Sequence, residues 1–142
     1  MRSSECSRGC RHLTGRFWET CANGAFLPEY PLVRRGLGRS QRLVDAVILP
    51  DEPYGRASVH DYPSLAGRNV VVVQTKRGRI GMYLMGQALF SARLALGCGA
   101  ASVRSILLYR FSDSALVPLL KEFPEVEVWL FSDADLSCKR LG

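Results

Sequence analysis

A run of four valines at residues 70–73 constrains the fold of this 142-residue chain more than any other feature. β-branched residues favour extended backbone, and side chains along a strand point alternately to opposite faces of a sheet. Valine at every position therefore predicts a strand buried on both faces, in the centre of a sheet that helices cover. The run continues into Gln74, Thr75 and Lys76, of which Gln74 and Lys76 share one face. Ligands of open α/β sheets bind near such carboxyl ends of strands, so we expect a site there.

Helices and strands are expected to alternate around this central strand. A mobile tail is expected over residues 1–12, and a short helix over residues 13–23 with Thr14 as its cap. Strands are expected at residues 30–33, 44–49, 70–76, 103–109 and 126–131, and helices at residues 82–96 and 113–123. The order αβββαβαβ predicts one α/β domain over residues 13–142, with a mixed central β-sheet flanked by helices. A helix joins the last two strands, which predicts that they are parallel.

The overall composition is that of a globular domain. Hydrophobic residues make up 47% and charged residues 23% of the chain, which argues against disorder and simple coiled coil. We find neither a membrane-length apolar run nor the apolar core of a signal peptide, so we expect a cytoplasmic protein without a membrane partner. The five cysteines are scattered, which favours free thiols over a disulfide framework. The spacing of Cys6, Cys10, His12 and Cys21 fits no common zinc pattern.

The charge balance permits a phosphate-rich partner. Nineteen Lys and Arg residues against thirteen Asp and Glu residues give a net charge of +6. Basic residues concentrate at residues 34–42 and 76–79, where they could follow a phosphate backbone or form a solvated basic surface. Under the first interpretation, the expected nucleic-acid contacts are Arg39, Arg42, Arg77 and Arg79.

A lone carboxylate, Asp45, interrupts the apolar strand expected at residues 44–49. If that strand lies beside the central one, Asp45 meets Gln74 and Lys76. An acid with a further oxygen ligand can hold Mg²⁺, which keeps several of its waters. A lysine beside such a metal can stabilise developing negative charge or help activate water at a phosphodiester.

The helix expected at residues 82–96 adds a polar stripe to this arrangement. Tyr83, Gln87 and Ser91 are spaced four residues apart and therefore share one side of the helix. The opposite side, which includes Ala88 and Ala95, is free to pack on the sheet. We expect the polar stripe to line the mouth of the site, with Tyr83 in contact with nucleic acid.

The ordered set Asp45, a long hairpin, Gln74-Thr75-Lys76 and a helix with Gln87 resembles the PD-(D/E)XK, or restriction-endonuclease-like, nucleases. It is particularly similar to the RecB-like branch, in which a glutamine follows on the next helix. The resemblance implies a restriction-endonuclease-like core and metal-dependent hydrolysis of phosphodiester bonds in DNA, with Mg²⁺ or Mn²⁺ as cofactor. Many members dimerise, and the apolar helix offers surface for a homodimer.

The same resemblance assigns roles to individual residues. It implies Asp45 and Gln74 as metal ligands, Lys76 as the catalytic lysine and Gln87 as a further site residue. Glu19 matches the acid that some families place on the first helix and is then a third metal ligand; Glu29 is the weaker candidate for that part.

Gln74 departs from the usual pattern, which has an acid before x-Lys, although some relatives carry glutamine there. An amide oxygen can coordinate Mg²⁺ but brings no negative charge, so metal affinity should fall. Two alternatives therefore stay open beside the nuclease: a catalytically inactive nuclease-fold binding or assembly module, and an α/β domain with an unrelated ligand.

Overall fold

The computed structural model describes residues 4–38, 40–57, 62–79, 82–111, 115, 117–132 and 137–140. Among these, side chains are described for residues 13–38, 40–57, 62–75, 85–109, 115, 118–130 and 140. The elements, in chain order, are α1 (Ser4–Cys21), β1 (Ala25–Val33), β2 (Arg42–Leu49), β3 (Gly55–Arg56), β4 (Asn69–Arg79), α2 (Met82–Gly97), β5 (Ser102–Phe111), α3 (Val117–Leu120), β6 (Val126–Ser132) and β7 (Ser137–Arg140).

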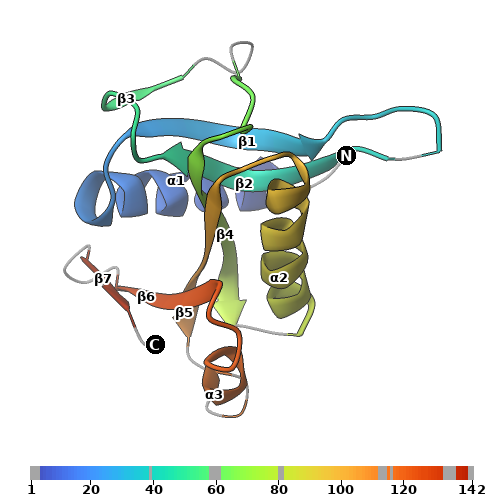
Figure 1. Ribbon diagram of the computed structural model, residues 1–142. Coiled ribbons are helices and arrows are strands. Elements are labelled where there is room, and N and C mark those ends of the chain that lie inside the picture. The colour runs from blue at the N-terminus through green and yellow to red at the C-terminus, as the bar shows by residue number, and fades with distance from the viewer. Residues whose placement is uncertain are drawn as a thin grey trace.

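One seven-stranded sheet forms the centre of the molecule, in the order β3-β1-β2-β4-β5-β6-β7. Strands β1, β2 and β4 pair antiparallel, whereas β4, β5 and β6 run parallel. The connections between the parallel strands run through α2 and α3 (Figure 1). The expected α/β class, the mixed sheet flanked by helices and the parallel last pair are confirmed.

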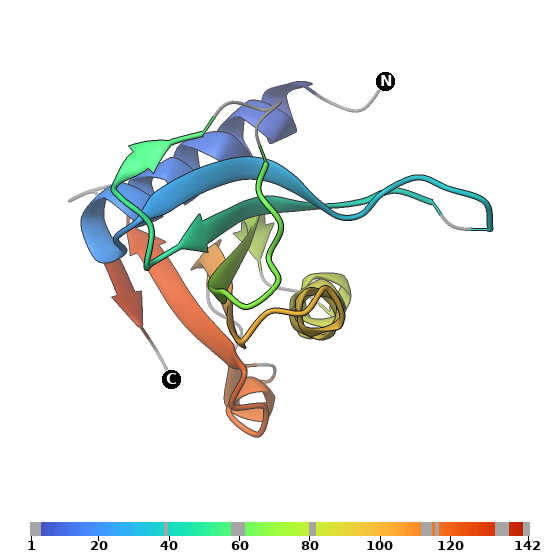
Figure 2. The same ribbon diagram turned by 45° about the horizontal axis from the view of Figure 1, so that its top comes forward.

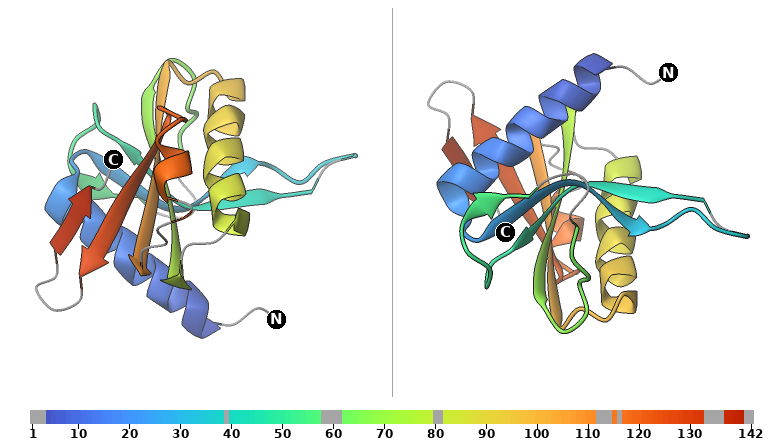
Figure 3. Two further views of the ribbon diagram at one scale, coloured as in Figure 1. Left: turned by 90° about the horizontal axis from the view of Figure 1, so that it is seen from below. Right: turned by 90° about the horizontal axis from the view of Figure 1, so that it is seen from above.

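Strand β4 is the central strand that the valine run predicts. All four valines of residues 70–73 are buried, with exposed fractions of 4% or less. The odd-numbered ones pack with Leu13 and Phe17 of α1, and the even-numbered ones pack with Ala95 of α2. The two helices therefore cover opposite faces of the sheet, as the views in Figure 3 also show.

Strands β1 and β2 form a long ribbon that leaves the sheet part-way along. They pair with each other from Ala25↔Leu49 to Val33↔Arg42. By contrast, β2 pairs with β4 only from Ile48↔Val71 to Ala46↔Val73. Beyond that pair the ribbon projects from the body as an arm, described over residues 31–38 and 40–43, which Figures 2 and 3 show reaching past α2. We call the point of separation, at Asp45 and Thr75, the fork.

Several expected boundaries are wrong, and each error has a local cause. Helix α1 begins at Ser4 rather than Leu13, so most of the segment assigned to a tail is helical. Thr14, expected as the cap, is fully buried inside this helix. Once a helix is anchored by packing, each further residue adds a hydrogen bond without a new nucleation cost. Strands β3 and β7 were not expected, because two and four residues are too few for a pattern to show.

Within the described residues, the helix in the region expected at residues 113–123 is much shorter than expected. Residues 112–114 and 116 lie outside the described part of the chain, and α3 covers Val117–Leu120. It ends in a turn in which the amide of Phe123 donates to the carbonyl of Leu120. Pro124 follows directly and cannot continue a helix.

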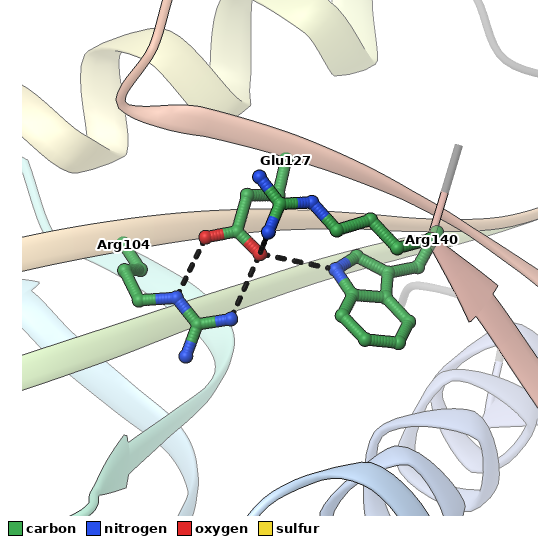
Figure 4. A network of polar contacts seen from close by, with 4 residues as sticks. Arg104, Glu127 and Arg140 are labelled. Atoms are coloured by element: carbon green, nitrogen blue, oxygen red, sulfur yellow. Dashed lines mark hydrogen bonds and ion pairs between the residues drawn. The ribbon is translucent and has the colours of Figure 1, made fainter. Parts of the chain in front are cut away.

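A charged cluster links β5, β6 and β7 (Figure 4). The Glu127 side chain is only 7% exposed and accepts a bidentate pair from Arg104, at 2.6 and 2.8 Å. The indole of Trp129 donates to the same carboxylate at 3.2 Å, and an Arg140 nitrogen lies 3.7 Å from it. Burial raises the pKa of Glu127, but the hydrogen bonds and charges of its partners outweigh this effect and lower the pKa below its usual value.

We predict that Glu127→Gln lowers the free energy of unfolding at neutral pH by about 1–2 kcal/mol, a modest cost because both arginines remain half-exposed to water. A lowered pKa stabilises the fold above the unfolded value of 4.5, and this contribution is lost as the pH falls through the folded value. Urea denaturation at about pH 7 and about pH 3 should therefore show a cost that disappears in acid. Glu122→Gln, at an exposed turn, is the matched control. An equal cost at both pH values would contradict the electrostatic explanation.

Candidate active site at the fork between β2 and β4

Asp45 lies at the fork, one residue beyond the last pair of β2 and β4. Continuing the register by one step places Asp45 opposite Gln74. The Oδ2 atom of Asp45 accepts a hydrogen bond from the backbone amide of Thr75 at 2.8 Å. The structure therefore brings the carboxylate directly beside the Gln74-Thr75-Lys76 segment, where the sequence places the site.

The hydrogen bond explains why an acid sits in this apolar strand. The pairing of β2 with β4 stops at Ala46↔Val73, and two residues further along β4 the Thr75 amide donates to the Asp45 side chain. A buried N–H group without an acceptor is costly, and the Asp45 side chain provides one. The carboxylate thus has a structural role at the fork whether or not it also binds a ligand.

The surroundings of Asp45 favour a cation. The pKa of Asp45 is raised to about 6, because the effects of burial, the largest, and of the Glu29 carboxylate outweigh the lowering by the Thr75 amide. Glu29 lies on β1 between the pairs Pro28↔Ala46 and Tyr30↔Val44, which places it across the ribbon from Asp45. A buried carboxylate whose ionisation a neighbouring acid makes more costly is a setting in which a divalent cation stabilises the charged form.

Gln74 is buried and held in one orientation. Its side chain is 4% exposed, and its Nε2 donates to the Oγ of Ser91 on α2 at 2.9 Å. Since the amide nitrogen cannot coordinate a cation, Oε1 is the Gln74 atom available as a ligand. Ser91 belongs to the predicted polar stripe and reaches the site. Gln87, from the same stripe, is exposed and lines the adjacent cleft.

Glu19 lies near the Leu49 end of β2, whereas Asp45 lies in the middle of that strand. Glu19 is exposed near the end of α1, next to Trp18, whose indole donates to the carbonyl of Gly24. Gly24 in turn lies against Leu49, the last residue of β2. The acid whose charge acts on Asp45 is Glu29. The register of the hairpin shifts by one residue between Pro31 and Val33, so counting back from the loop in the sequence would have placed Tyr30, not Glu29, opposite Asp45.

Several predicted contacts lie outside the described side chains. Lys76 pairs with Tyr109 in the β4–β5 ladder, which fixes its backbone one residue beyond Thr75. The side chains of Lys76, Arg77, Arg79 and Tyr83 are not among those described, and Arg39 lies outside the described residues altogether. Arg42 is described and is exposed at the base of the arm. The roles assigned to these residues stay predictions.

A cleft of about 560 Å³ opens between the arm and α2, directly beside the fork. Gln74 and Ser91 lie in it together with residues of the arm and of α2. Its full lining is Leu32, Arg42, Leu43, Val44, Gln74, Gly86, Gln87, Phe90, Ser91 and Leu94. The cleft therefore connects the candidate site to the surface of the molecule.

The donor set at the fork fits Mg²⁺ or Mn²⁺ better than a metal that needs a complete protein cage. Within the described part of the chain, no three His, Cys, Asp or Glu residues gather as a metal-binding group. Mg²⁺ is commonly held by one or two carboxylates, with waters completing its coordination. Asp45, Gln74 and the neighbouring Glu29 carry oxygen donors of this kind.

Comparison with known proteins adds no relative to this description. No protein-family model, no curated protein and no solved structure matches the chain. Among the described residues, no helix is both long and apolar enough to cross a membrane.

We predict that Asp45→Asn stabilises the metal-free protein at neutral and alkaline pH. The folded pKa, about 6, lies above the unfolded value of 3.8, so ionisation of Asp45 destabilises the fold as the pH rises through this window. Asparagine stays neutral and its carbonyl can still accept the Thr75 amide. In buffer with EDTA, urea denaturation should show a gain of up to about 2–3 kcal/mol at about pH 8 and none at about pH 3.5. Asp51→Asn is the control; a loss at both pH values would contradict the prediction.

Proposed function

We propose that the chain is a metal-dependent nuclease-fold protein that hydrolyses phosphodiester bonds in DNA. The observation that carries this proposal is the position of Asp45, whose carboxylate is bonded to the amide between Gln74 and Lys76. Asp45, Gln74 and Lys76 therefore come from neighbouring backbone positions of β2 and β4. This is the juxtaposition that metal-assisted phosphoryl chemistry requires.

The order of elements supports the proposal without deciding it. One helix, an antiparallel trio of strands, a second helix and a parallel strand follow one another, which agrees with a restriction-endonuclease-like core. A shared fold supports many functions, so the proposal rests on the site.

In the proposed reaction, Asp45 and the Oε1 of Gln74 would hold Mg²⁺ or Mn²⁺, with Glu29 as a neighbouring acid. The bound metal supplies Lewis-acid stabilisation and a lowered pKa for the attacking water. The Thr75 amide orients the Asp45 carboxylate, and Ser91 orients the Gln74 amide. Lys76 stabilises the negative charge that develops on the phosphate. Because Asp45 must lose its proton to bind a cation, metal affinity should rise with pH up to about 7.

We predict that cleavage of DNA in Mg²⁺ or Mn²⁺ falls at least about 100-fold in Asp45→Ala and in Lys76→Ala, which remove a metal ligand and a charge at the phosphate. Gel assays with single-stranded and double-stranded substrates measure the effect. Lys121→Ala, at an exposed turn after α3, is the control for loss of one positive charge. The proposal fails if Lys76→Ala and the wild type cleave equally.

We also predict which of the two glutamates supports the metal. Glu29→Gln should weaken Mn²⁺ binding about 10-fold, as expected for loss of a neighbouring acid, whereas Glu19→Gln should leave it unchanged. Titration calorimetry measures both variants against the wild type. Weaker binding in Glu19→Gln alone would reverse the assignment made from the fork.

One observation favours the second candidate, a nuclease-fold binding or assembly module without catalysis. Gln74 is neutral, and Ser91 already engages its amide nitrogen, so the site lacks one negative charge. A carboxylate at this position would add the missing charge. If the wild type neither binds Mn²⁺ nor cleaves DNA while Gln74→Glu does both, the second candidate is correct.

A further inference from the structure

We infer that the cleft between the arm and α2 is a binding site for an unpaired nucleobase, which places the substrate strand at the fork. The inference rests on the proposed function in one respect only: Gln74 belongs both to the cleft and to the proposed metal site. It names the class of substrate, a nucleic acid with at least one unstacked base beside the reacting phosphate.

Phe90 forms the aromatic wall of this cleft. It is 68% exposed, although the same helix buries Ala88, Ala92 and Ala95 completely against the sheet. Helical spacing puts Gln87, Phe90 and Leu94 on one side, and all three line the cleft. An exposed phenylalanine at the mouth of a concave site offers a surface on which a base can stack.

The arm forms the opposite wall and brings positive charge. Leu43 is 50% exposed and faces the cleft beside the buried Val44. Arg42 stands at the rim, where its Nη1 donates to the Oγ of Ser40 at 2.6 Å and to the carbonyl of Gln41 at 3.3 Å. These bonds hold the guanidinium close to the backbone, in a position to meet the phosphate of a base inserted between Phe90 and Leu43.

The inner part of the cleft is polar. Gln74 and Ser91 are 4% and 6% exposed and bonded to each other, and Gln87 adds a second amide nearer the surface. Amide side chains supply both donors and acceptors, which suits the edge of a nucleobase. A purely apolar partner would offer no hydrogen bond to the Gln87 amide.

Charge and size both favour a nucleotide over a second copy of the chain. The arm carries exposed arginines at residues 34, 35 and 42, which a like-charged copy of the arm would repel. The cleft volume of about 560 Å³ falls within the range of small-ligand sites. A base inside a duplex is stacked on both sides and cannot enter, so the base must be single-stranded, frayed or flipped out.

Fluorescence anisotropy in EDTA tests the inference without catalysis, with labelled oligothymidylate of about 15 nucleotides as the probe. Phe90→Ala and Phe90→Leu should both weaken binding about 5- to 100-fold, because neither offers an aromatic face. Phe90→Trp should retain it. Phe123→Ala, an exposed phenylalanine outside the cleft, is the matched control. An abasic oligonucleotide of the same length should bind more weakly and be indifferent to Phe90→Ala.

Three results would overturn the inference. Equal weakening of the normal and abasic probes by Phe90→Ala would place the contact on the backbone rather than on a base. If Phe90→Ala left the binding of both probes unchanged, the cleft would not be a nucleobase site. If Phe90→Ala converted a dimer to a monomer in sedimentation and left oligonucleotide binding unchanged, the cleft would be a contact between two copies of the chain.

The proposed function can fail separately. Base-dependent binding without cleavage by the wild type would leave the nucleobase site standing and reject catalysis. If Phe90→Ala and the wild type cleave DNA equally and binding does not depend on a base, the catalytic proposal stands and the nucleobase site is rejected.

Discussion

The burial of β4 on both faces is the constraint on which the rest of the molecule depends. Its valines need apolar cover on both sides, and α1 and α2 provide it from opposite directions. A polar side chain can be accommodated in such a strand only where the cover ends or where another element satisfies it. Gln74 is placed by the second route, through its hydrogen bond to Ser91. The valine run therefore determines where the chain can position polar chemistry.

The fork follows from the same constraint. Strand β2 pairs with β4 only where both are covered, and beyond Ala46 the β1–β2 ribbon turns away to form the arm. The separation exposes one backbone amide, which Asp45 caps, and opens the cleft beside it. Glu29 has a positive φ of 54° at this level of the ribbon, a conformation that few residues other than glycine adopt. The local strain, the capped amide and the two carboxylates thus coincide at one place.

Sequence patterns predicted those parts of this arrangement that depend on local periodicity. The valine run specified the central strand. The interruption of an apolar strand by Asp45 correctly predicted that this acid lies next to Gln74. The spacing of four residues between Gln87 and Ser91 correctly predicted that Ser91 faces the site. Patterns failed where long-range geometry decides. The preference for Glu19 over Glu29 assumed a position on the first helix, whereas the hairpin register determines which acid meets Asp45. The exposure of Phe90 could not be predicted either, because the apolar residues of this helix cover more than the side that packs on the sheet.

The energetics of the metal-free state give a physical reason for glutamine at position 74. Burial and Glu29 already raise the pKa of Asp45 to about 6. A third carboxylate, only 4% exposed at the position of Gln74, would have to ionise beside two acids in a poorly solvated site. Its burial would either keep a proton on the cluster at neutral pH or destabilise the sheet at its most buried strand. Glutamine keeps an oxygen donor and forms a hydrogen bond to Ser91, so the fork remains stable without a cation. Under the proposed function, glutamine would also remove a charge that attracts the metal, so it would favour stability of the fold at the expense of affinity for a divalent cation.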